Sequence, residues 1–452
     1  MITHPVPGHT RHAQPSSSPA REVHPIRPLA ALVGASQQVP LVQGGQVPYA
    51  NLDYAASAPA LESVAARVNE ILPLYASVHR GAGYASLVCT AAYESARAEI
   101  ACFIGAGPTD VVIFTRNTTD ALNLLASAAP GPDVYLDVEH HANLLPWQAR
   151  GGRVVTAQPT LAATLSAIGD ELARHPAALL AVTGASNVTG ELLPLPDLAA
   201  LAHRHGARLA VDGAQLVPHR AVDMGSAGVD YLAFSGHKVY APFGAGVLAG
   251  PRDWLDAASP HLAGGGAVRE VTPTTVAWAD SPARHEGGTP NLLGAVALAE
   301  ACRVLSSLAP GAAAHEAALT GRMRGGLAAL GATVHTIWPD AVESVGIVSF
   351  SLPGTDAALL ATYLSAEHGI GVRDGRFCAH PLFARLGIDR AVRASLGLGS
   401  SSEDVDRLIG AVETFMVQGP SWSYQQSGGG WQPVPDSRPM PDALPGSACT
   451  EA

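Results

Sequence analysis

Lys238 is the only lysine in this chain, because every other member of its 27 lysine and arginine residues is an arginine. Either residue serves as a solvated cation on a protein surface. Only lysine has an amine that can lose its proton, since the guanidinium of arginine stays charged. A solitary lysine is therefore a candidate for covalent chemistry through a neutral amine, such as a Schiff base with a carbonyl compound. A compositional bias toward arginine would leave the same pattern, so the residues near Lys238 decide between the two interpretations.

Short polar segments follow several predicted strands of the chain. The strands are residues 111–114, 134–136, 179–182, 209–211 and 231–234, and the polar segments after them are 115–119, 139–143, 186–190, 212–215 and 235–238. A sheet of parallel strands places its ligand site at the carboxyl ends of the strands. The polar segments therefore predict one shared site that contains Lys238.

The cofactor pyridoxal phosphate (PLP) needs four kinds of group, and these segments contain all four. Its aldehyde needs a lysine amine, and its pyridine nitrogen needs a carboxylate to stay protonated, so that the ring can act as an electron sink. Its phosphate needs hydroxyls and the N–H groups at a helix N-terminus, and its ring needs a flat partner on one face. In the same order, these groups are Lys238, Asp212, Thr118 and Thr119 with Ser235, and His140.

The elements that position these segments alternate between strand and helix patterns. A helix predicted from Pro196 to His205 has proline at its start and Gly206 just past its end, which are typical helix boundaries. Strands that alternate with helices predict an α/β fold with a mostly parallel sheet. Near the C-terminus, the serines at 400–402 are followed by Glu403 and Asp404, which predicts the start of a last helix.

Composition divides the chain into four predicted parts. These are a flexible N-terminal leader at 1–45, a large PLP-binding domain at 46–304, a small C-terminal domain at 305–417, and a disordered tail at 418–452 that is rich in proline and glycine. Polar leaders and tails such as the first and last of these parts bury too little apolar surface to fold alone.

The overall composition excludes several classes of protein. With 47% hydrophobic and 14% charged residues the chain is globular, and a net charge of −11 without a basic run argues against nucleic-acid binding. The sequence contains no uninterrupted apolar stretch of about 18 residues, so no membrane span is predicted. The cysteines (Cys89, Cys102, Cys302, Cys378 and Cys449) are odd in number and far apart. They indicate neither a disulfide framework nor a metal site, and we expect a reducing cytoplasm and no bound metal.

Further segments extend the pattern over residues 49–415. They are Asn51–Pro59, Val78–Gly81, Pro146–Gln148, Glu286–Asn291, Gly375–Leu382 and Arg393–Ser395. Together with the segments above, and in this order, they resemble the class V aminotransferase superfamily of fold type I PLP enzymes, and within it the type II cysteine desulfurase and selenocysteine lyase family. The resemblance implies a homodimer whose large domain has a mostly parallel seven-stranded sheet flanked by helices, with a smaller α+β C-terminal domain.

The resemblance also implies a role for individual residues. Contacts with PLP are expected from Thr118, Thr119, His140, Asn187, Asp212, Gln215, Ser235, His237 and Lys238, with Thr289 reaching the phosphate held by the partner subunit. Contacts with the substrate are expected from Asn187, Arg373 and Arg393. The planar fork of an arginine matches a carboxylate through two hydrogen bonds. The catalytic residues implied are Lys238, His140 and Cys378.

Cys378 matches the persulfide-forming cysteine of that family. An isolated cysteine beside a phenylalanine is more often a small buried apolar residue, but the loop around Cys378 favours a nucleophile. Its thiolate forms near neutral pH only beside positive charge, which Arg373 and Arg376 could supply.

The chain departs from the family pattern at three places. Arg376–Phe377 stands where the family usually has a histidine pair, and Leu398–Ser401 stands where it has an aromatic residue followed by Asn and Thr. Asn117 replaces a glycine in the phosphate turn, where asparagine tolerates a positive φ. The first two departures leave the cofactor site intact and bear on the substrate and on sulfur transfer.

We expect the conversion of a small amino acid, L-cysteine, to L-alanine, with the sulfur held as a persulfide on Cys378 for an acceptor protein. One alternative is a related PLP-dependent C–S lyase or a selenocysteine lyase in which Cys378 is not essential. A remote one is a non-catalytic binding protein with a PLP fold. Retention of Lys238 and Asp212 argues against the last, because a scaffold needs no electron sink.

Overall fold

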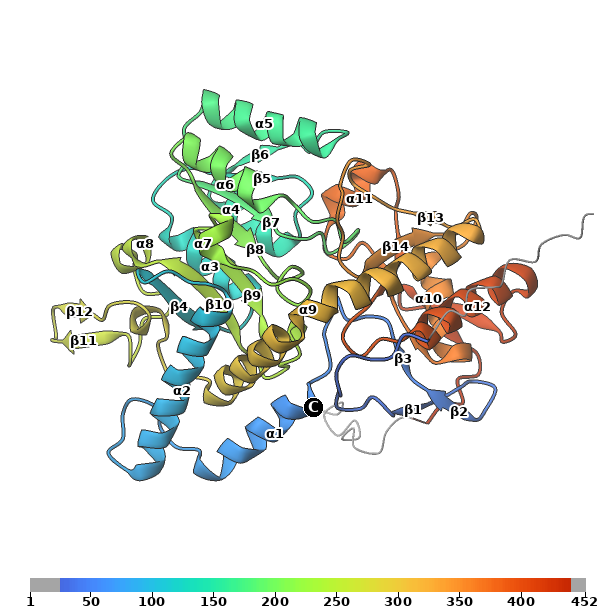
Figure 1. Ribbon diagram of the computed structural model, residues 1–452, viewed down its shortest axis with the longest axis horizontal. Coiled ribbons are helices and arrows are strands. Elements are labelled where there is room, and N and C mark those ends of the chain that lie inside the picture. Colours follow the sequence, from blue (N-terminus) through green and yellow to red (C-terminus); the bar gives the residue numbers. More distant parts are fainter. Residues whose placement is uncertain (1–24, 440–452) are drawn as a thin grey trace, which may run out of the picture.

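The computed structural model describes residues 25–439 of the chain (Figure 1). Its centre is a seven-stranded sheet with the strand order β4-β10-β9-β8-β7-β5-β6. The strands are β4 (Asp110–Thr115), β5 (Asp133–Leu136), β6 (Arg153–Val155), β7 (Leu179–Thr183), β8 (Arg208–Asp212), β9 (Tyr231–Ser235) and β10 (Gly246–Pro251). Only β10 runs antiparallel to its neighbours. The prediction of a mostly parallel seven-stranded sheet is confirmed.

The strands are apolar on both faces, as expected for a sheet covered on both sides. In β7, Leu180 and Val182 belong to one hydrophobic core, while Leu179 and Ala181 belong to another. The helices around the first core are α1 (Glu62–Ile71), α2 (Tyr84–Phe103), α5 (Leu161–Arg174), α6 (Leu195–Arg204), α7 (Met224–Ala227) and the first part of α9 (Leu292–Ala329). Those around the second are α3 (Thr118–Ala128), α4 (Leu145–Ala149) and α8 (Arg252–Ala257).

A smaller domain, at the right of Figure 1, has its own four-stranded sheet and its own core. Its antiparallel strands are β13 (Thr333–Val334), β14 (Ile347–Ser351), β16 (Arg373–Gly375) and β17 (Ala391–Ser395), and its helices are α10 (Ala357–His368) and α12 (Ser402–Gln418). Helix α11 (His380–Leu386) lies between them in sequence, but its buried Leu382 and Phe383 belong to the first core of the large domain. The helix predicted from its serines is α12, which Ser401 caps in a capping box with Asp404. The expected α+β domain is therefore present.

Helix α9 joins the two domains and contributes side chains to both cores. The domain boundary that we placed between residues 304 and 305 falls inside this single helix, because one continuous apolar helix serves both domains. By length and composition α9 also passes the test for a membrane span, which the sequence did not lead us to expect. However, 56% of its most apolar window is buried inside the protein, as in a core helix.

Parts of the predicted leader and tail have defined structure and pack on the small domain. Strands β1 (Gln38–Pro40) and β2 (Gln46–Pro48) form a hairpin, and β3 (Ala50–Asn51) pairs with β15 (Ile370–Gly371). Beyond α12, β18 (Tyr424–Ser427) and β19 (Gly430–Pro433) form a second hairpin against α10. The prediction of flexible segments thus differs from the structure for residues 25–45 and 418–439. Residues 1–24 and 440–452, with Cys449, lie outside the described residues.

The remaining elements lie in the connections of the large domain. They are the 3-10 turns η1 (Leu72–Leu74), η2 (His141–Asn143), η3 (Gly236–Lys238) and η4 (Ala283–His285), and the hairpin of β11 (Val268–Val271) and β12 (Val276–Trp278). Two of them, η2 and η3, begin just after β5 and β9 and bring His140 and Lys238 to the carboxyl edge of the sheet.

Candidate active site

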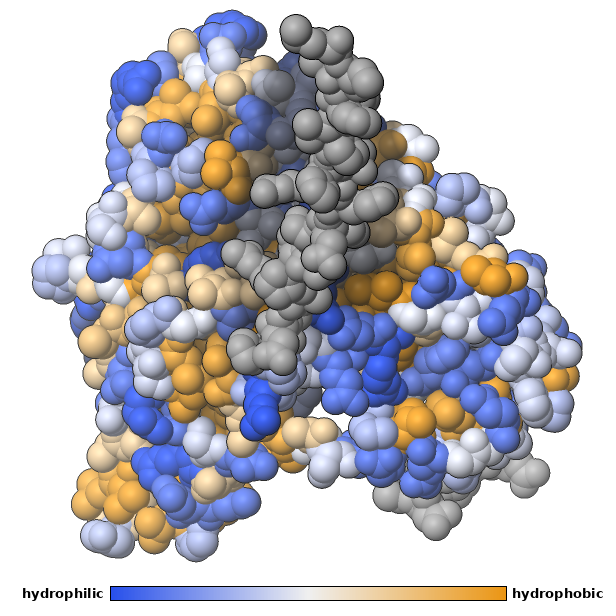
Figure 2. Space-filling model, turned by 45° about the vertical axis from the view of Figure 1, so that its right-hand side comes forward, coloured by the Kyte–Doolittle hydropathy of each residue, from blue (hydrophilic) through white to orange (hydrophobic). Residues whose placement is uncertain are grey.

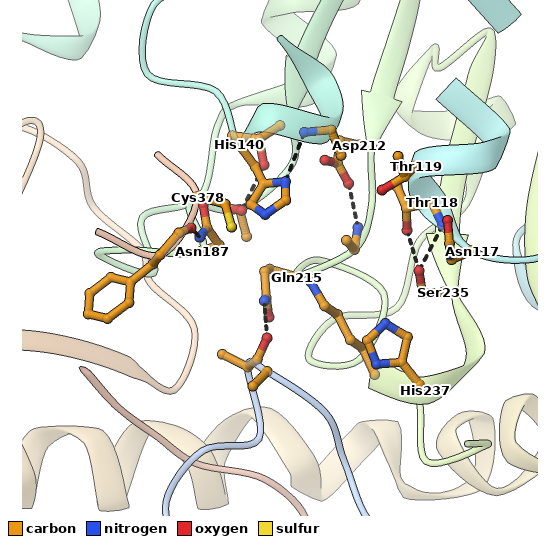
Figure 3. A pocket seen from close by; sticks show the side chains of 18 of the residues that line it. Asn117, Thr118, Thr119, His140, Asn187, Asp212, Gln215, Ser235, His237 and Cys378 are labelled. Atoms are coloured by element: carbon orange, nitrogen blue, oxygen red, sulfur yellow. Dashed lines mark hydrogen bonds between the residues drawn. The ribbon is translucent and has the colours of Figure 1, made fainter. Parts of the chain in front are cut away.

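A cavity of about 250 Å³ lies at the carboxyl ends of the parallel strands, where the large domain meets β16, β17 and the loop before α11. Figure 3 shows the side chains that line it. The structure brings together there nearly all the residues expected to act, namely Thr118, Thr119, His140, Asn187, Asp212, Gln215, Ser235, His237, Lys238, Arg373, Cys378 and Arg393. The exception is Thr289, which is exposed and does not line the cavity.

Lys238 enters the cavity from η3, directly after β9. The turn is tight at Gly236, where a Cβ atom would lie 2.8 Å from the carbonyl oxygen of Ala245, so a side chain does not fit there. Burial lowers the pKa of Lys238 to about 8, although the nearby Asp212 carboxylate opposes this shift. The amine is thus easier to deprotonate than that of a solvated lysine.

Asp212 ends β8 and is buried beside Lys238. Its Oδ1 accepts a hydrogen bond from the backbone N–H of Ala214 at 2.9 Å. Burial raises the pKa of Asp212, and the Ala214 N–H and the Lys238 charge oppose the rise. A buried carboxylate of this kind suits a positively charged partner in the cavity. Gln215, one turn further on, donates from Nε2 to the carbonyl oxygen of Ala55 at 2.8 Å.

The N-terminus of α3 forms a pocket lined by hydroxyl groups. Asn117 caps the helix by accepting from the N–H of Asp120 at 3.0 Å. The Ser235 hydroxyl bonds both the N–H and the hydroxyl of Thr118, at 2.8 and 2.7 Å, as drawn in Figure 3. Such a helix start attracts an anion. Asn117 has a φ of −171°, so the expected need for a positive φ at this position is wrong.

The position in this turn that requires a glycine lies instead on the neighbouring strand, β10. A Cβ atom on Gly246, at the start of β10, would lie 2.5 Å from the Cα of Asn117. Glycine at 246 therefore lets β10 pass beside the helix start without displacing it.

His140 presents a neutral ring to the cavity. Its Nδ1 accepts from the N–H of Ala142 at 3.0 Å, which leaves the ring proton on Nε2. Burial, and then the nearby charge of Lys238, lower its pKa to about 3. A flat and uncharged imidazole is thus available at neutral pH. His237 is also in the cavity wall, with Nδ1 3.3 Å from the Ser57 hydroxyl.

Arg393, on β17, is 3% exposed and reaches the cavity from the small domain. Its Nη1 donates to the carbonyl oxygen of Asn187 at 2.9 Å, and its Nη2 donates to Oδ1 of Asp53 at 3.1 Å. Arg373, its neighbour across the β16–β17 pair, also lines the cavity. Burial raises the pKa of Asp53, and the charge of Arg393 opposes the rise. Two guanidinium groups are therefore available to a carboxylate.

The loop that carries Cys378 is strained and held in place. Phe377 and Cys378 have φ angles of 48° and 54°, and such left-handed conformations cost non-glycine residues about 1–3 kcal/mol each. The large domain holds both carbonyl oxygens: Asn187 Nδ2 donates to Phe377 at 2.8 Å, and the N–H of His141 donates to Cys378 at 2.8 Å. The Cys378 side chain stays exposed at the cavity wall, and Figure 3 shows it beside His140.

One expectation about this loop needs correction. Arg376 does not serve Cys378, because its guanidinium is paired with the carboxylate of Asp389. The adjacent histidines play different parts. His140 faces the cavity, whereas His141 is in edge-to-face contact with His380 at 4.6 Å between ring centroids and binds the Cys378 loop through its backbone.

Sequence reasoning missed the parts of Asp53 and Phe377. Asp53 lies in the Asn51–Pro59 segment, which was recognised as a motif without a role, and its pairing with Arg393 bridges 340 positions of sequence. Phe377 was noted only as a departure from the family pattern. Spacing gives no signal for contacts of this kind, since both depend on how the two domains meet.

The donor set agrees with what PLP requires. An amine of lowered pKa, a buried carboxylate, a hydroxyl-lined helix start and a neutral imidazole meet around one cavity, from Lys238, Asp212, Thr118 with Ser235, and His140. These are the separate needs of the aldehyde, the ring nitrogen, the phosphate and the ring face.

Comparison with known proteins agrees with this arrangement. The model of the class-V aminotransferase family matches residues 50–408. A cysteine desulfurase of Dickeya dadantii (strain 3937) is 39% identical over 381 residues, which cover 80% of this chain and 90% of that protein. A cysteine desulfurase of Klebsiella pneumoniae (strain 342) is 38% identical, with 81% and 93% covered.

Two solved structures extend the comparison to the fold. The apo structure of a cysteine desulfurase from Thermococcus onnurineus NA1 has a TM-score of 0.76 and 32% identity, and covers 81% of this chain and 94% of that one. The S-sulfonic acid form of the Escherichia coli cysteine desulfurase CsdA has a TM-score of 0.70 and 32% identity, with the same coverage. This chain belongs to the class-V aminotransferase family and, within it, to the cysteine desulfurases.

Proposed function

We propose that this protein is a PLP-dependent cysteine desulfurase, which converts L-cysteine to L-alanine and holds the sulfur as a persulfide on Cys378. The observation that carries the proposal is the make-up of one cavity wall. The Cys378 thiol comes from the small domain and lines the same cavity as Lys238 and Asp212 of the large domain. The names of the relatives point to the same reaction.

The substrate is held through its carboxylate. Arg393 and Asn187 form the subsite, with Arg373 at its side, and the planar guanidinium of Arg393 suits a carboxylate. Asp53 balances the buried charge of Arg393. An amino acid bound by its carboxylate here has its side chain in the cavity that Cys378 lines.

PLP, when bound, supplies an electron sink that allows bonds at the substrate carbons to break. Lys238 provides the amine that holds it and is the only lysine able to do so. Asp212 would stabilise a positive charge on the ring nitrogen, and neutral His140 would offer the ring a flat partner without adding charge of its own. The start of α3, with Thr118, Thr119 and Ser235, takes the phosphate.

Sulfur transfer is the task of Cys378. Its thiolate attacks the sulfur of the bound cysteine, so that an S–S bond forms while the carbon–sulfur bond breaks, and the carbon keeps the electron pair and takes a proton. The step balances without an oxidant: L-cysteine and the Cys378 thiol give L-alanine and the Cys378 persulfide. An acceptor protein with a free thiol would then remove the outer sulfur. We also propose the cytoplasm as the compartment, because Cys89, Cys102, Cys302 and Cys378 are all free thiols.

When PLP is added to the cofactor-free protein, the rate at which Lys238 binds it should depend on pH. Only the neutral amine attacks an aldehyde, and the pKa of Lys238 is lowered to about 8. The capture rate, followed by absorbance, should therefore rise with pH up to about 8 and then level off. Lys238→Arg should capture none at any pH. A rate that keeps rising toward the ordinary lysine pKa of about 10.4 would contradict the shift.

The active form is expected to be a symmetric dimer in which Thr289 reaches the phosphate held by the partner. Thr289 follows Glu286, whose buried carboxylate accepts from Arg97, the Tyr93 hydroxyl and the N–H of Phe114. The segment is thus firmly held, yet exposed at Thr289. Exposed apolar side chains at the corner of η1 and α2, namely Leu72, Leu74, Tyr75, Tyr84 and Leu87, also support a subunit contact. Figure 2 shows this end at the lower left, with hydrophobic side chains on its surface.

Light scattering should find the dimer. The Thr289→Ala variant should remain a dimer but release PLP about 10-fold faster, since a hydrogen bond to a charged group is lost. Thr275→Ala, on the exposed loop between β11 and β12, is the matched control and should leave release unchanged. A fully active monomer would contradict the proposed assembly.

Product analysis tests the proposed function against its rivals. L-Cysteine, L-cystine and L-selenocysteine are each incubated with the wild-type protein, and alanine, pyruvate, sulfide and enzyme-bound sulfur are measured. A desulfurase gives alanine from cysteine in step with enzyme-bound sulfur. Pyruvate with free sulfide would identify a C–S lyase, and alanine from selenocysteine alone would identify a selenocysteine lyase.

A further inference from the structure

The aromatic ring of Phe377 lies under the guanidinium of Arg393. The ring centroid is 4.9 Å from the Cζ atom of Arg393. Both side chains are buried, with 5% of Phe377 and 3% of Arg393 exposed. A guanidinium removed from water needs partners on its faces as well as its edges, and a cation–π contact is strongest where water is excluded. Phe377 provides one face of that enclosure.

The hydrogen bonds that Arg393 makes within the described part of the protein leave N–H groups of its guanidinium unpaired. Nη1 and Nη2 are bonded to the Asn187 carbonyl and to Asp53. Nε is buried and has no hydrogen-bond partner among residues 25–439. Two edge bonds and one face contact therefore fix the plane of the guanidinium. Three of its five N–H groups, including that of Nε, stay unpaired among these residues and are available to the carboxylate of an arriving amino acid.

Phe377 is itself held where this contact requires it. Its carbonyl oxygen accepts from Asn187 Nδ2 at 2.8 Å, and its ring meets Phe383 edge-on at 5.5 Å. Its φ of 48° turns the chain so that residue 377 is buried and Cys378 is exposed. Asn187 thus binds both the loop and Arg393, which joins the carboxylate subsite to the nucleophile loop.

We propose that Phe377 is a positioning residue for the substrate carboxylate: its ring holds Arg393 in the orientation that receives it. The role rests on the proposed function, since it assigns part of the same site. It also gives a physical meaning to a departure from the family pattern. A histidine at position 377 would place a titratable group against Arg393, whereas phenylalanine offers only an aromatic face.

The test compares variants of the PLP-loaded enzyme that keep or remove the aromatic face. Phe377→Leu and Phe377→Met keep an apolar side chain without a ring, Phe377→Tyr keeps the ring, and Phe383→Leu removes the neighbouring ring, which does not touch Arg393. KM and kcat for L-cysteine are measured. The dissociation constant of L-alanine is obtained separately from the absorbance change of the bound cofactor, which requires no turnover. Cysteamine, which lacks a carboxylate, is titrated in the same way.

Phe377→Leu and Phe377→Met should raise KM and the L-alanine dissociation constant about 3- to 30-fold, with a much smaller change in kcat and no change for cysteamine. Phe377→Tyr should restore most of the affinity. Phe383→Leu removes the edge contact that supports Phe377 but leaves the Phe377 ring on Arg393, so it should raise both constants by less than the Phe377 variants do. The proposal is overturned if the Leu and Met variants bind L-alanine normally, if cysteamine binding weakens equally, or if Phe383→Leu acts as strongly. If the wild type binds L-alanine but forms none from cysteine, the proposed function fails and the positioning role can still be judged from binding.

Discussion

Lys238→Ala is expected to abolish the visible absorbance of the PLP Schiff base and to lower the desulfuration rate by on the order of 10⁴-fold or more, as for loss of a covalent catalyst. No second lysine exists that could take its place. Lys238→Arg is a matched control, because it keeps the positive charge beside Asp212 but has no amine that deprotonates. It should be as inactive and as colourless as the alanine variant.

The same lysine allows a direct chemical test. Borohydride reduction of the wild-type protein fixes the cofactor to the amine, and peptide mapping should find the label on the peptide of Lys238 alone. Protein that is colourless after purification and cannot be reconstituted with PLP would contradict the enzyme assignment. Retained visible colour in Lys238→Arg would show that the cofactor is held by other contacts.

Cys378→Ala should lower the rate of cysteine desulfuration by on the order of 10³-fold or more, because no thiolate is then present to attack the sulfur of cysteine and accept it. L-Alanine binding should stay within about 2-fold of the wild type, since the hydrogen bonds of Arg393 and Asn187 do not involve the Cys378 side chain. Selenocysteine turnover should suffer less, because selenium leaves without attack by a thiolate. The rates are measured as alanine formed with each substrate.

Cys102→Ala is the matched control for the loss of a thiol. Cys102 is also free and exposed, but it lies at the end of α2 and not in the cavity. This variant should keep wild-type activity. A Cys378→Ala enzyme that desulfurates cysteine at the wild-type rate would leave the C–S lyase interpretation in its place.

Much of the large domain could be predicted from local sequence, because its strands are short, continuous apolar runs. Strands β7, β8 and β9 are buried on both faces, and their residues read as strands without reference to the rest of the chain. Strand β10 was not among the expected strands. It begins with Gly246 and contains Gly250, which weaken a strand pattern, and its place is decided by pairing with β4 and β9.

The ends of the chain show where composition misleads. Glycine and proline near residue 428 indicated disorder, yet the hairpin of β18 and β19 is fixed by distant residues. The buried carboxylate of Glu367 accepts from the N–H groups of Ser421 and Trp422 and from the hydroxyl of Tyr424. Such an anchor is created by tertiary packing and leaves no local pattern.

The candidate site divides in the same way. Its large-domain residues follow predicted strands, so convergence at the carboxyl ends of the sheet was expected from the sequence. The pairing of Arg393 with Asp53, the left-handed backbone at Phe377 and Cys378, and the pairing of Arg376 with Asp389 were not. Each depends on how the small domain packs, which residue spacing does not reveal.

The most direct test of the account is the mass of the Cys378 peptide after a single turnover with L-cysteine, measured without reducing agents. The account predicts one added sulfur atom on that peptide, in step with the alanine formed, and none on the peptides of Cys89, Cys102 or Cys302. Alanine formed with no sulfur added to Cys378, and all the sulfur released as free sulfide, would contradict it.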